Sequence, residues 1–132
     1  MNRRQFSLLA GSALVLPRFA FANIIDYTPG LVDEHLARGE TVFVDFYAPW
    51  CSTCRAQDRV VEQLRQSNPA YDQAMTFIRV DWDTYGTEEL SRRLAIPRRS
   101  TLVVLRGEAE LGRVVAGTSA QDIQALMDLG LS

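Results

Sequence analysis

Two cysteines carry the clearest chemistry in this 132-residue sequence, and they are the only cysteines in it. Cys51 and Cys54 are separated by two residues and follow Trp50. A pair at this spacing can exchange disulfides, because one thiolate attacks a partner disulfide and the second thiol then resolves the mixed disulfide. A static disulfide and a zinc site are the alternatives, but zinc would need two further ligands and His35 is the only histidine.

The predicted elements place these cysteines where a strand ends and a helix begins. The run 42–47 is β-branched and aromatic, which predicts a buried strand, and residues 51–66 carry a helical apolar stripe. Free N–H groups and the helix dipole at a helix N-terminus stabilise a thiolate. We therefore predict that Cys51 is the nucleophile, exposed enough to react with another molecule, and that Cys54 is the resolving thiol.

One acid and two apolar residues accompany the pair. Asp45 lies inside the apolar strand, where burial disfavours the carboxylate and raises its pKa; a solvated acid at an edge is the alternative. Pro49 and Trp50 directly precede Cys51 and are candidate partner-docking residues. We expect Trp50 to shield the sulfurs and to offer an apolar contact to a partner chain; a core aromatic is the alternative.

The rest of the sequence predicts one α/β domain over residues 23–132. Strands are expected at 23–27, 42–47, 75–80, 101–105 and 110–116, and helices at 31–38, 51–66, 87–94 and 120–129, with Thr87 as the N-cap of the third helix. This order predicts a central mixed sheet with helices on both faces. The domain contains 11 arginines and 16 acids, a net charge of −5, which argues against nucleic acid or an anionic membrane as a general partner.

Residues 1–22 are predicted to be an export signal peptide rather than part of the fold. The segment around Arg3 and Arg4 resembles a twin-arginine signal, and residues 20–22 (Ala-Phe-Ala) form a small-x-small cleavage site. The apolar run 8–16 is shorter than the roughly 20 residues that a membrane-spanning helix needs. An ordinary secretory signal and an uncleaved anchor are the alternatives. Cleavage would leave Asn23 as the mature start, in a bacterial periplasm where disulfides persist.

Over nearly all of residues 23–132 the sequence resembles the thioredoxin-fold family. The resemblance rests on V-D-F-Y-A-P-W-C-S-T-C at 44–54, the strand T-L-V-V-L at 101–105, the turn at Gly107 and Gly117 before the last helix. It implies a thioredoxin fold and a thiol–disulfide oxidoreductase that acts on protein disulfides without a cofactor. The predicted export signal places this enzyme in the periplasm, where a reductant role needs a membrane electron donor. Asp45 and the Trp-Cys context of the pair resemble the reducing members of the family, so a reductant role is favoured over an oxidant role. A metal-handling or redox-sensing binding protein and a redox-inert docking domain are the other hypotheses.

The resemblance also implies roles for several residues. Asp45 would accept the proton of Cys54 through water, and Arg79 stands where relatives often carry a lysine paired with that acid. The family places a cis-proline before its T-L strand, but here Ser100 takes that position. We therefore predict a trans bond between Arg99 and Ser100, because a cis bond before a non-proline residue costs about 2.5–4 kcal/mol.

The alternative to a trans bond before Ser100 is that Pro97, three residues earlier, is the family's cis-proline. The partner-docking edge implied by the family includes Arg99, Ser100 and Thr101. If Arg98 and Arg99 face the cysteines, their charges would favour the Cys51 thiolate.

Overall fold

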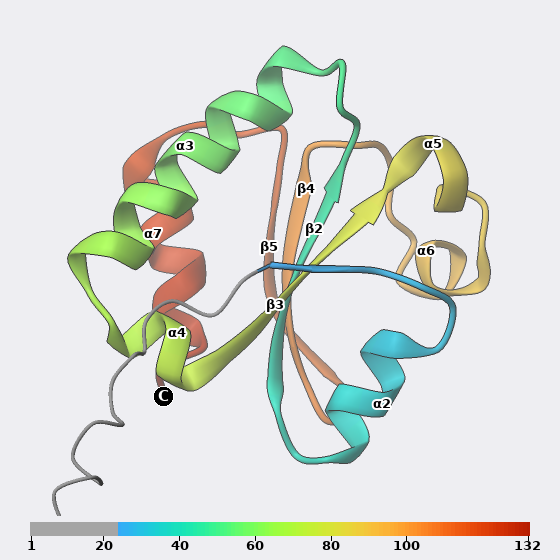
Figure 1. Ribbon diagram of the computed structural model, residues 1–132, viewed down its shortest axis with the longest axis horizontal. Coiled ribbons are helices and arrows are strands. Elements are labelled where there is room, and N and C mark those ends of the chain that lie inside the picture. The colour runs from blue at the N-terminus through green and yellow to red at the C-terminus, as the bar shows by residue number, and fades with distance from the viewer. Residues whose placement is uncertain (1–23) are drawn as a thin grey trace, which may run out of the picture.

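A computed structural model describes residues 24–132, so the predicted export segment 1–22 and the predicted mature start at Asn23 lie outside the described residues. Five strands form one mixed sheet in the order β1-β3-β2-β4-β5 (Figure 1). The strands are β1 (Ile25–Asp26), β2 (Thr41–Tyr47), β3 (Met75–Asp81), β4 (Thr101–Arg106) and β5 (Ala109–Val115). The central strand β2 pairs parallel with β3 and antiparallel with β4, which confirms the predicted mixed sheet.

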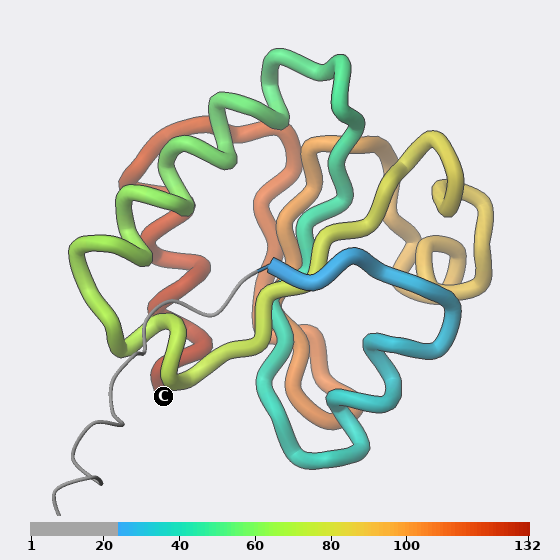
Figure 2. The backbone as a smooth tube through the Cα atoms, in the orientation of Figure 1, coloured from blue at the N-terminus to red at the C-terminus, as the bar shows by residue number. Residues whose placement is uncertain are grey.

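Helices cover both faces of this sheet, as the tube view shows (Figure 2). One face carries α2 (Leu31–Ala37), α5 (Trp82–Tyr85) and α6 (Glu89–Arg93), and the other carries α3 (Ser52–Ser67), α4 (Ala70–Ala74) and α7 (Ala120–Leu129). Within residues 24–132 none of these helices has the length and apolar character needed to cross a membrane.

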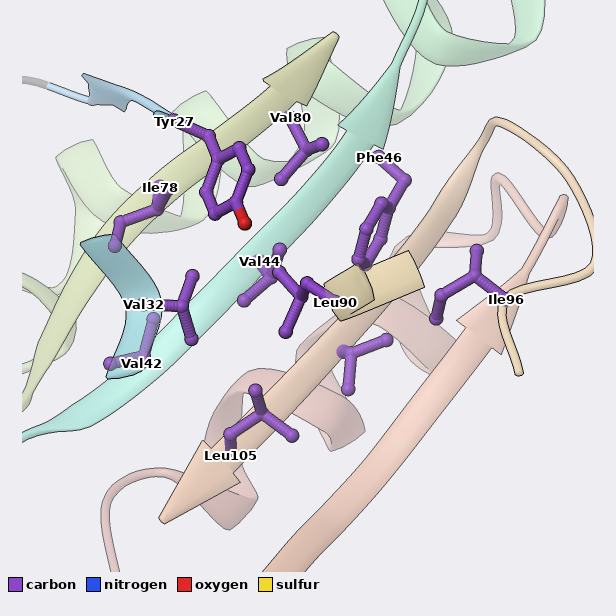
Figure 3. Close-up of a cluster of buried hydrophobic side chains, with 11 residues drawn as sticks. Tyr27, Val32, Val42, Val44, Phe46, Ile78, Val80, Leu90, Ile96 and Leu105 are labelled. Atoms are coloured by element: carbon purple, nitrogen blue, oxygen red, sulfur yellow. The ribbon is translucent and has the colours of Figure 1, made fainter. Parts of the chain in front are cut away.

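Side-chain alternation along β2 decides what faces each helical layer. Val42, Val44 and Phe46 point to the side of α2 and α6, where they join a buried apolar cluster (Figure 3). Phe43 belongs to the opposite cluster, which packs under α3 and α7. Because successive residues of a strand face opposite sides, Asp45 shares the face of Phe43 and lies beneath α3. Burial of each apolar side chain of this size stabilises the fold by about 1.5–3 kcal/mol, and β2 contributes such side chains to both helical layers.

Two short helices were not predicted, and one cap was predicted wrongly. Pro69 is the N-cap residue of α4, and its φ of −65° suits the start of a helix. The carboxylate of Asp81 accepts the N–H of Asp83 and thereby begins α5. The N-cap of α6 is Glu88 rather than Thr87, because the Glu88 carboxylate accepts the N–H of Leu90.

Candidate redox site

Cys51 and Cys54 occupy the first turn of α3, as the sequence predicts. Cys51 is the N-cap residue in an extended conformation, φ −91° and ψ 117°, and its sulfur accepts the backbone N–H of Cys54 at 3.2 Å. Both side chains are free thiols. The sulfur that caps the helix therefore lies where an otherwise unpaired N–H group favours a thiolate.

A third side chain, Ser100, lies against both sulfurs. Its Oγ is 3.2 Å from Sγ of Cys51 and 3.0 Å from Sγ of Cys54. Ser100 precedes β4 and is completely buried, so the loop between α6 and β4 closes over the start of α3. No peptide bond within residues 24–132 is cis. This confirms the predicted trans bond before Ser100 and shows that the alternative, a cis bond before Pro97, is wrong.

The two thiols are driven to different protonation states. Burial alone would raise the pKa of Cys51, but hydrogen bonds from the Cys54 thiol, the Ser100 hydroxyl, the Cys54 N–H and Arg99 outweigh it and lower that pKa to about 6. Burial and the hydrogen bond of the Cys54 thiol to Cys51 raise the pKa of Cys54. At neutral pH the pair therefore consists of a Cys51 thiolate beside a Cys54 thiol, which is the division of labour that exchange chemistry needs.

Both cysteines are less exposed than the sequence analysis expected. Cys51 retains 3% of its accessible surface and Cys54 1%, whereas the neighbouring Trp50 is 58% exposed. The physical reason is the position of Ser100, which packs directly on the sulfurs. Of these three side chains, only Trp50 therefore presents a large surface to solvent.

Trp50 is held on two sides. The guanidinium carbon of Arg99 lies 4.4 Å from the centre of its ring, a cation–π contact, and its indole N–H donates to Asp83 at 2.8 Å. Arg99 thus faces the cysteines, which is the condition for its charge to favour the Cys51 thiolate. Its neighbour Arg98 instead donates to the carbonyl of Arg99 at 2.9 Å.

The other predicted docking residues divide by exposure. Pro49 is exposed beside Trp50. Thr101 is completely buried and donates to the carbonyl of Arg98 at 2.8 Å, so its side chain fixes the loop. A contact of these residues with a partner stays a prediction.

Asp45 is buried, which confirms that expectation over the solvated alternative. It is 6% exposed, and its Oδ1 has no hydrogen-bond partner among the described residues. It borders a pocket of about 210 Å³ together with Asp58, Glu62 and Arg79. Burial, followed by the hydrogen bond and charge of Asp58, raises the pKa of Asp45 well above its usual value, and Arg79 offsets this only in part. Its role as a proton acceptor stays a prediction.

Asp58 was missed by the sequence analysis, although a signal for it was present. It follows Cys54 by one helical turn on α3 and therefore lies on the same face as that thiol, above β2.

Arg79 lies beside Asp45 in the register of β2 and β3 but forms its ion pair elsewhere. Its Nε is 2.8 Å from Oδ1 of Asp26 on the edge strand β1, and its guanidinium lies 5.1 Å from the centre of the Tyr47 ring. Within residues 24–132 no ion pair joins Arg79 to Asp45, so the considered pairing is not formed. Arg79 and Asp26 are both exposed, and pairing there avoids the cost of burying a guanidinium.

Gln57 is a further residue that the sequence did not single out. It is completely buried in α3, and its Nε2 donates to the carbonyls of Ser100 and Gly117, at 2.9 Å each. The side chain thus joins α3 to the loop that precedes β4 and to the loop that follows β5.

The described residues show no further ligand cluster near the cysteines. Within residues 24–132 no group of three or more His, Cys, Asp and Glu side chains is arranged so that it could hold a metal ion.

The thioredoxin family profile matches residues 24–129. The chain belongs to the thioredoxin family. It is 28% identical to Thioredoxin-1 of Saccharomyces cerevisiae over 94 residues, which cover 71% of this chain and 85% of that protein. It is also 28% identical to protein disulfide-isomerase tigA of Aspergillus niger over 100 residues, 75% of this chain and 27% of that longer protein.

Among solved structures, Trxlp from Edwardsiella tarda EIB202 superposes with a TM-score of 0.68 at 27% identity, covering 79% of this chain and 98% of that one. Together with the free thiols on α3, this membership makes the chain a thioredoxin-like thiol–disulfide oxidoreductase.

Proposed function

We propose that the protein reduces disulfide bonds in protein partners outside the cytoplasm and is itself reduced again by a membrane electron donor. The observation that carries the exchange chemistry is the position of Cys51 at the N-cap of α3, where its sulfur accepts the Cys54 N–H at 3.2 Å and a thiolate is favoured beside the Cys54 thiol. The thiolate attacks a partner sulfur and forms a mixed disulfide. Cys54 then attacks Cys51, the partner leaves as a reduced thiol, and the enzyme is left with a disulfide.

A protein substrate fits the surface beside the nucleophile. Trp50 presents a half-exposed indole next to Cys51, and the charge of Arg99 lies over its ring. Aromatic residues and arginine are enriched at protein–protein interfaces. The printed name of the tigA relative, a protein disulfide-isomerase, supports the same substrate class.

The acidity of Cys51 supports the reducing direction. The pKa of the attacking cysteine is about 7 in thioredoxin and about 3.5 in a strongly oxidising dithiol protein. The value of about 6 for Cys51 lies closer to the first. We therefore expect a reduction potential nearer to about −270 mV, as in thioredoxin, than to about −120 mV, as in that oxidant.

A variant series tests the exchange chemistry. Cys51→Ser should abolish reduction of insulin disulfides by the dithiothreitol-reduced protein, because serine cannot supply a thiolate. Cys54→Ser should instead accumulate a mixed disulfide with the substrate, visible as a shifted band on a non-reducing gel. Ser67→Ala, at the exposed far end of α3, is the matched control and should keep full activity. Full activity of Cys51→Ser would refute the proposal.

The direction of electron flow is tested by measuring the reduction potential of the Cys51–Cys54 couple through equilibration with glutathione. A potential close to that of the strong oxidant would reverse the proposed electron flow while leaving the exchange chemistry intact.

The proposed location rests on residues 1–22 of the sequence alone. Arg3 and Arg4 are the paired arginines of the signal, so changing both to lysine should block export of the full chain in a bacterial host. Fractionation of the host would show the protein retained in the cytoplasm. Unchanged export by the variant would assign the segment to an ordinary secretory signal.

A further inference from the structure

The hydroxyl of Ser100 contacts both reacting sulfurs at once. Its distances of 3.2 and 3.0 Å to Cys51 and Cys54 are within hydrogen-bond range for sulfur. The proline that the family resemblance places at this position has no hydroxyl and could make neither bond.

The backbone holds this contact at a conformational cost. Ser100 has φ +65°, a left-handed conformation that residues other than glycine adopt uncommonly. Its N–H donates to the Phe46 carbonyl at 2.7 Å, and its carbonyl accepts the N–H of Ala116 at 2.8 Å and Nε2 of Gln57 at 2.9 Å. Bonds to β2, to α3 and to the residue after β5 thus hold the hydroxyl against the sulfurs.

The hydrogen-bond capacity of a hydroxyl matches one redox state of the pair. It can donate one bond and accept others. Beside a thiolate and a thiol, it donates to Cys51, and its oxygen lies within hydrogen-bond range of the Cys54 sulfur, whose one S–H it shares with the Cys51 thiolate. In the Cys51–Cys54 disulfide there is no negative sulfur to receive the donor and no S–H to give, so both bonds are weakened or lost.

The electron balance shows which state gains. When an external dithiol reduces the disulfide, two electrons break the Cys51–Cys54 bond, one proton goes to Cys54, and Cys51 remains a thiolate. The external dithiol becomes a disulfide and its second proton goes to solvent. A group that stabilises only the reduced products makes the protein a weaker reductant.

We propose that Ser100 sets the reduction potential of the couple by stabilising the reduced cysteine pair through its hydroxyl. This rests on the proposed exchange function and deepens it, because it names the residue that limits how strongly the protein reduces its partners. The acidity of Cys51, lowered in part by this hydroxyl, supports the same assignment.

Two variants of the full-length protein test the proposal. Ser100→Ala removes only the hydroxyl, and Ser100→Gly removes it while also relieving the positive φ. Ser91→Ala is the matched control, because Ser91 is a buried serine whose hydroxyl donates to the Tyr85 carbonyl, away from the cysteines. Thiolate absorbance at 240 nm is followed against pH, and the reduction potential is measured by equilibration with glutathione.

Both Ser100 variants should raise the Cys51 pKa by about one unit, because each removes the hydroxyl that donates to the Cys51 thiolate, and hydrogen bonds to a charged group are stronger than neutral ones. If the Cys51 pKa rises from about 6 to about 7, the equilibrium constant for reducing a partner disulfide at about pH 7 rises about fivefold. The reduction potential of the couple then falls by about 20 mV, at 29.6 mV per tenfold change. Ser91→Ala should change neither quantity.

An unchanged pKa and potential in both Ser100 variants would overturn the proposal. A change in Ser100→Gly alone would also overturn it, because the effect would then belong to the backbone conformation. Failure of the wild-type protein to reduce any protein disulfide would count against the proposed function instead. The comparison of potentials needs only the cysteine pair itself, so the two failures are distinguishable.

Discussion

Replacement of Cys54 by alanine should make Cys51 measurably less acidic. Among the contacts that lower the pKa of Cys51, the hydrogen bond from the Cys54 thiol is the largest, and only the opposing effect of burial exceeds it. Alanine removes this donor while leaving the backbone N–H of residue 54 to cap the Cys51 sulfur.

The size of the effect follows from the strength of one such bond. A hydrogen bond to a charged group contributes about 1.5–3 kcal/mol, and one pKa unit corresponds to about 1.36 kcal/mol. The pKa of Cys51 should therefore rise from about 6 to about 7–8. At about pH 7 its thiolate fraction would fall from about nine tenths to between about one half and about one tenth.

The assay is the rate of alkylation by iodoacetamide as a function of pH, which follows the thiolate of Cys51. At about pH 7 the Cys54→Ala protein should react about two- to tenfold more slowly than the wild type. Cys54→Ser is the matched control, because its hydroxyl can still donate and should hold the midpoint near the wild-type value. Identical midpoints for all three proteins would refute the reasoning and assign the acidity to the remaining contacts.

Two stability predictions concern residues beneath the site and at the end of the chain. The folded-state pKa of Asp45 is raised by burial and by Asp58, so its stabilising contribution is full below the unfolded value and is lost as pH rises through the folded value. Asp45→Asn should therefore be more stable than the wild type at about pH 8 in urea unfolding, with the difference closing towards about pH 4; a constant difference would contradict this. In Gly130→Ala the added methyl would overlap the sulfur of Met75 and lie 2.8 Å from its Cγ, which should cost about 1–3 kcal/mol in the same measurement; an unchanged midpoint would show that Met75 moves aside freely.

The sequence by itself determined the elements that carry the cysteines. An apolar β-branched run and a helical apolar stripe are local patterns, and they place Cys51 and Cys54 on the first turn of α3. The same local logic predicts that Asp45 is buried, since it interrupts an otherwise apolar strand. The strands and the mixed sheet follow from this order of elements, whereas the very short helices α4 and α5 carry too few residues for a periodic signal.

Only the tertiary structure decided which side chains meet at the cysteines. The contact of Ser100 with both sulfurs depends on the path of a loop and on a positive φ that no spacing predicts. The pairing of Arg79 with Asp26 rather than Asp45 depends on where the edge strand lies. Such contacts join residues far apart in the chain, so they are settled by packing and strand register and not by any local pattern of residues.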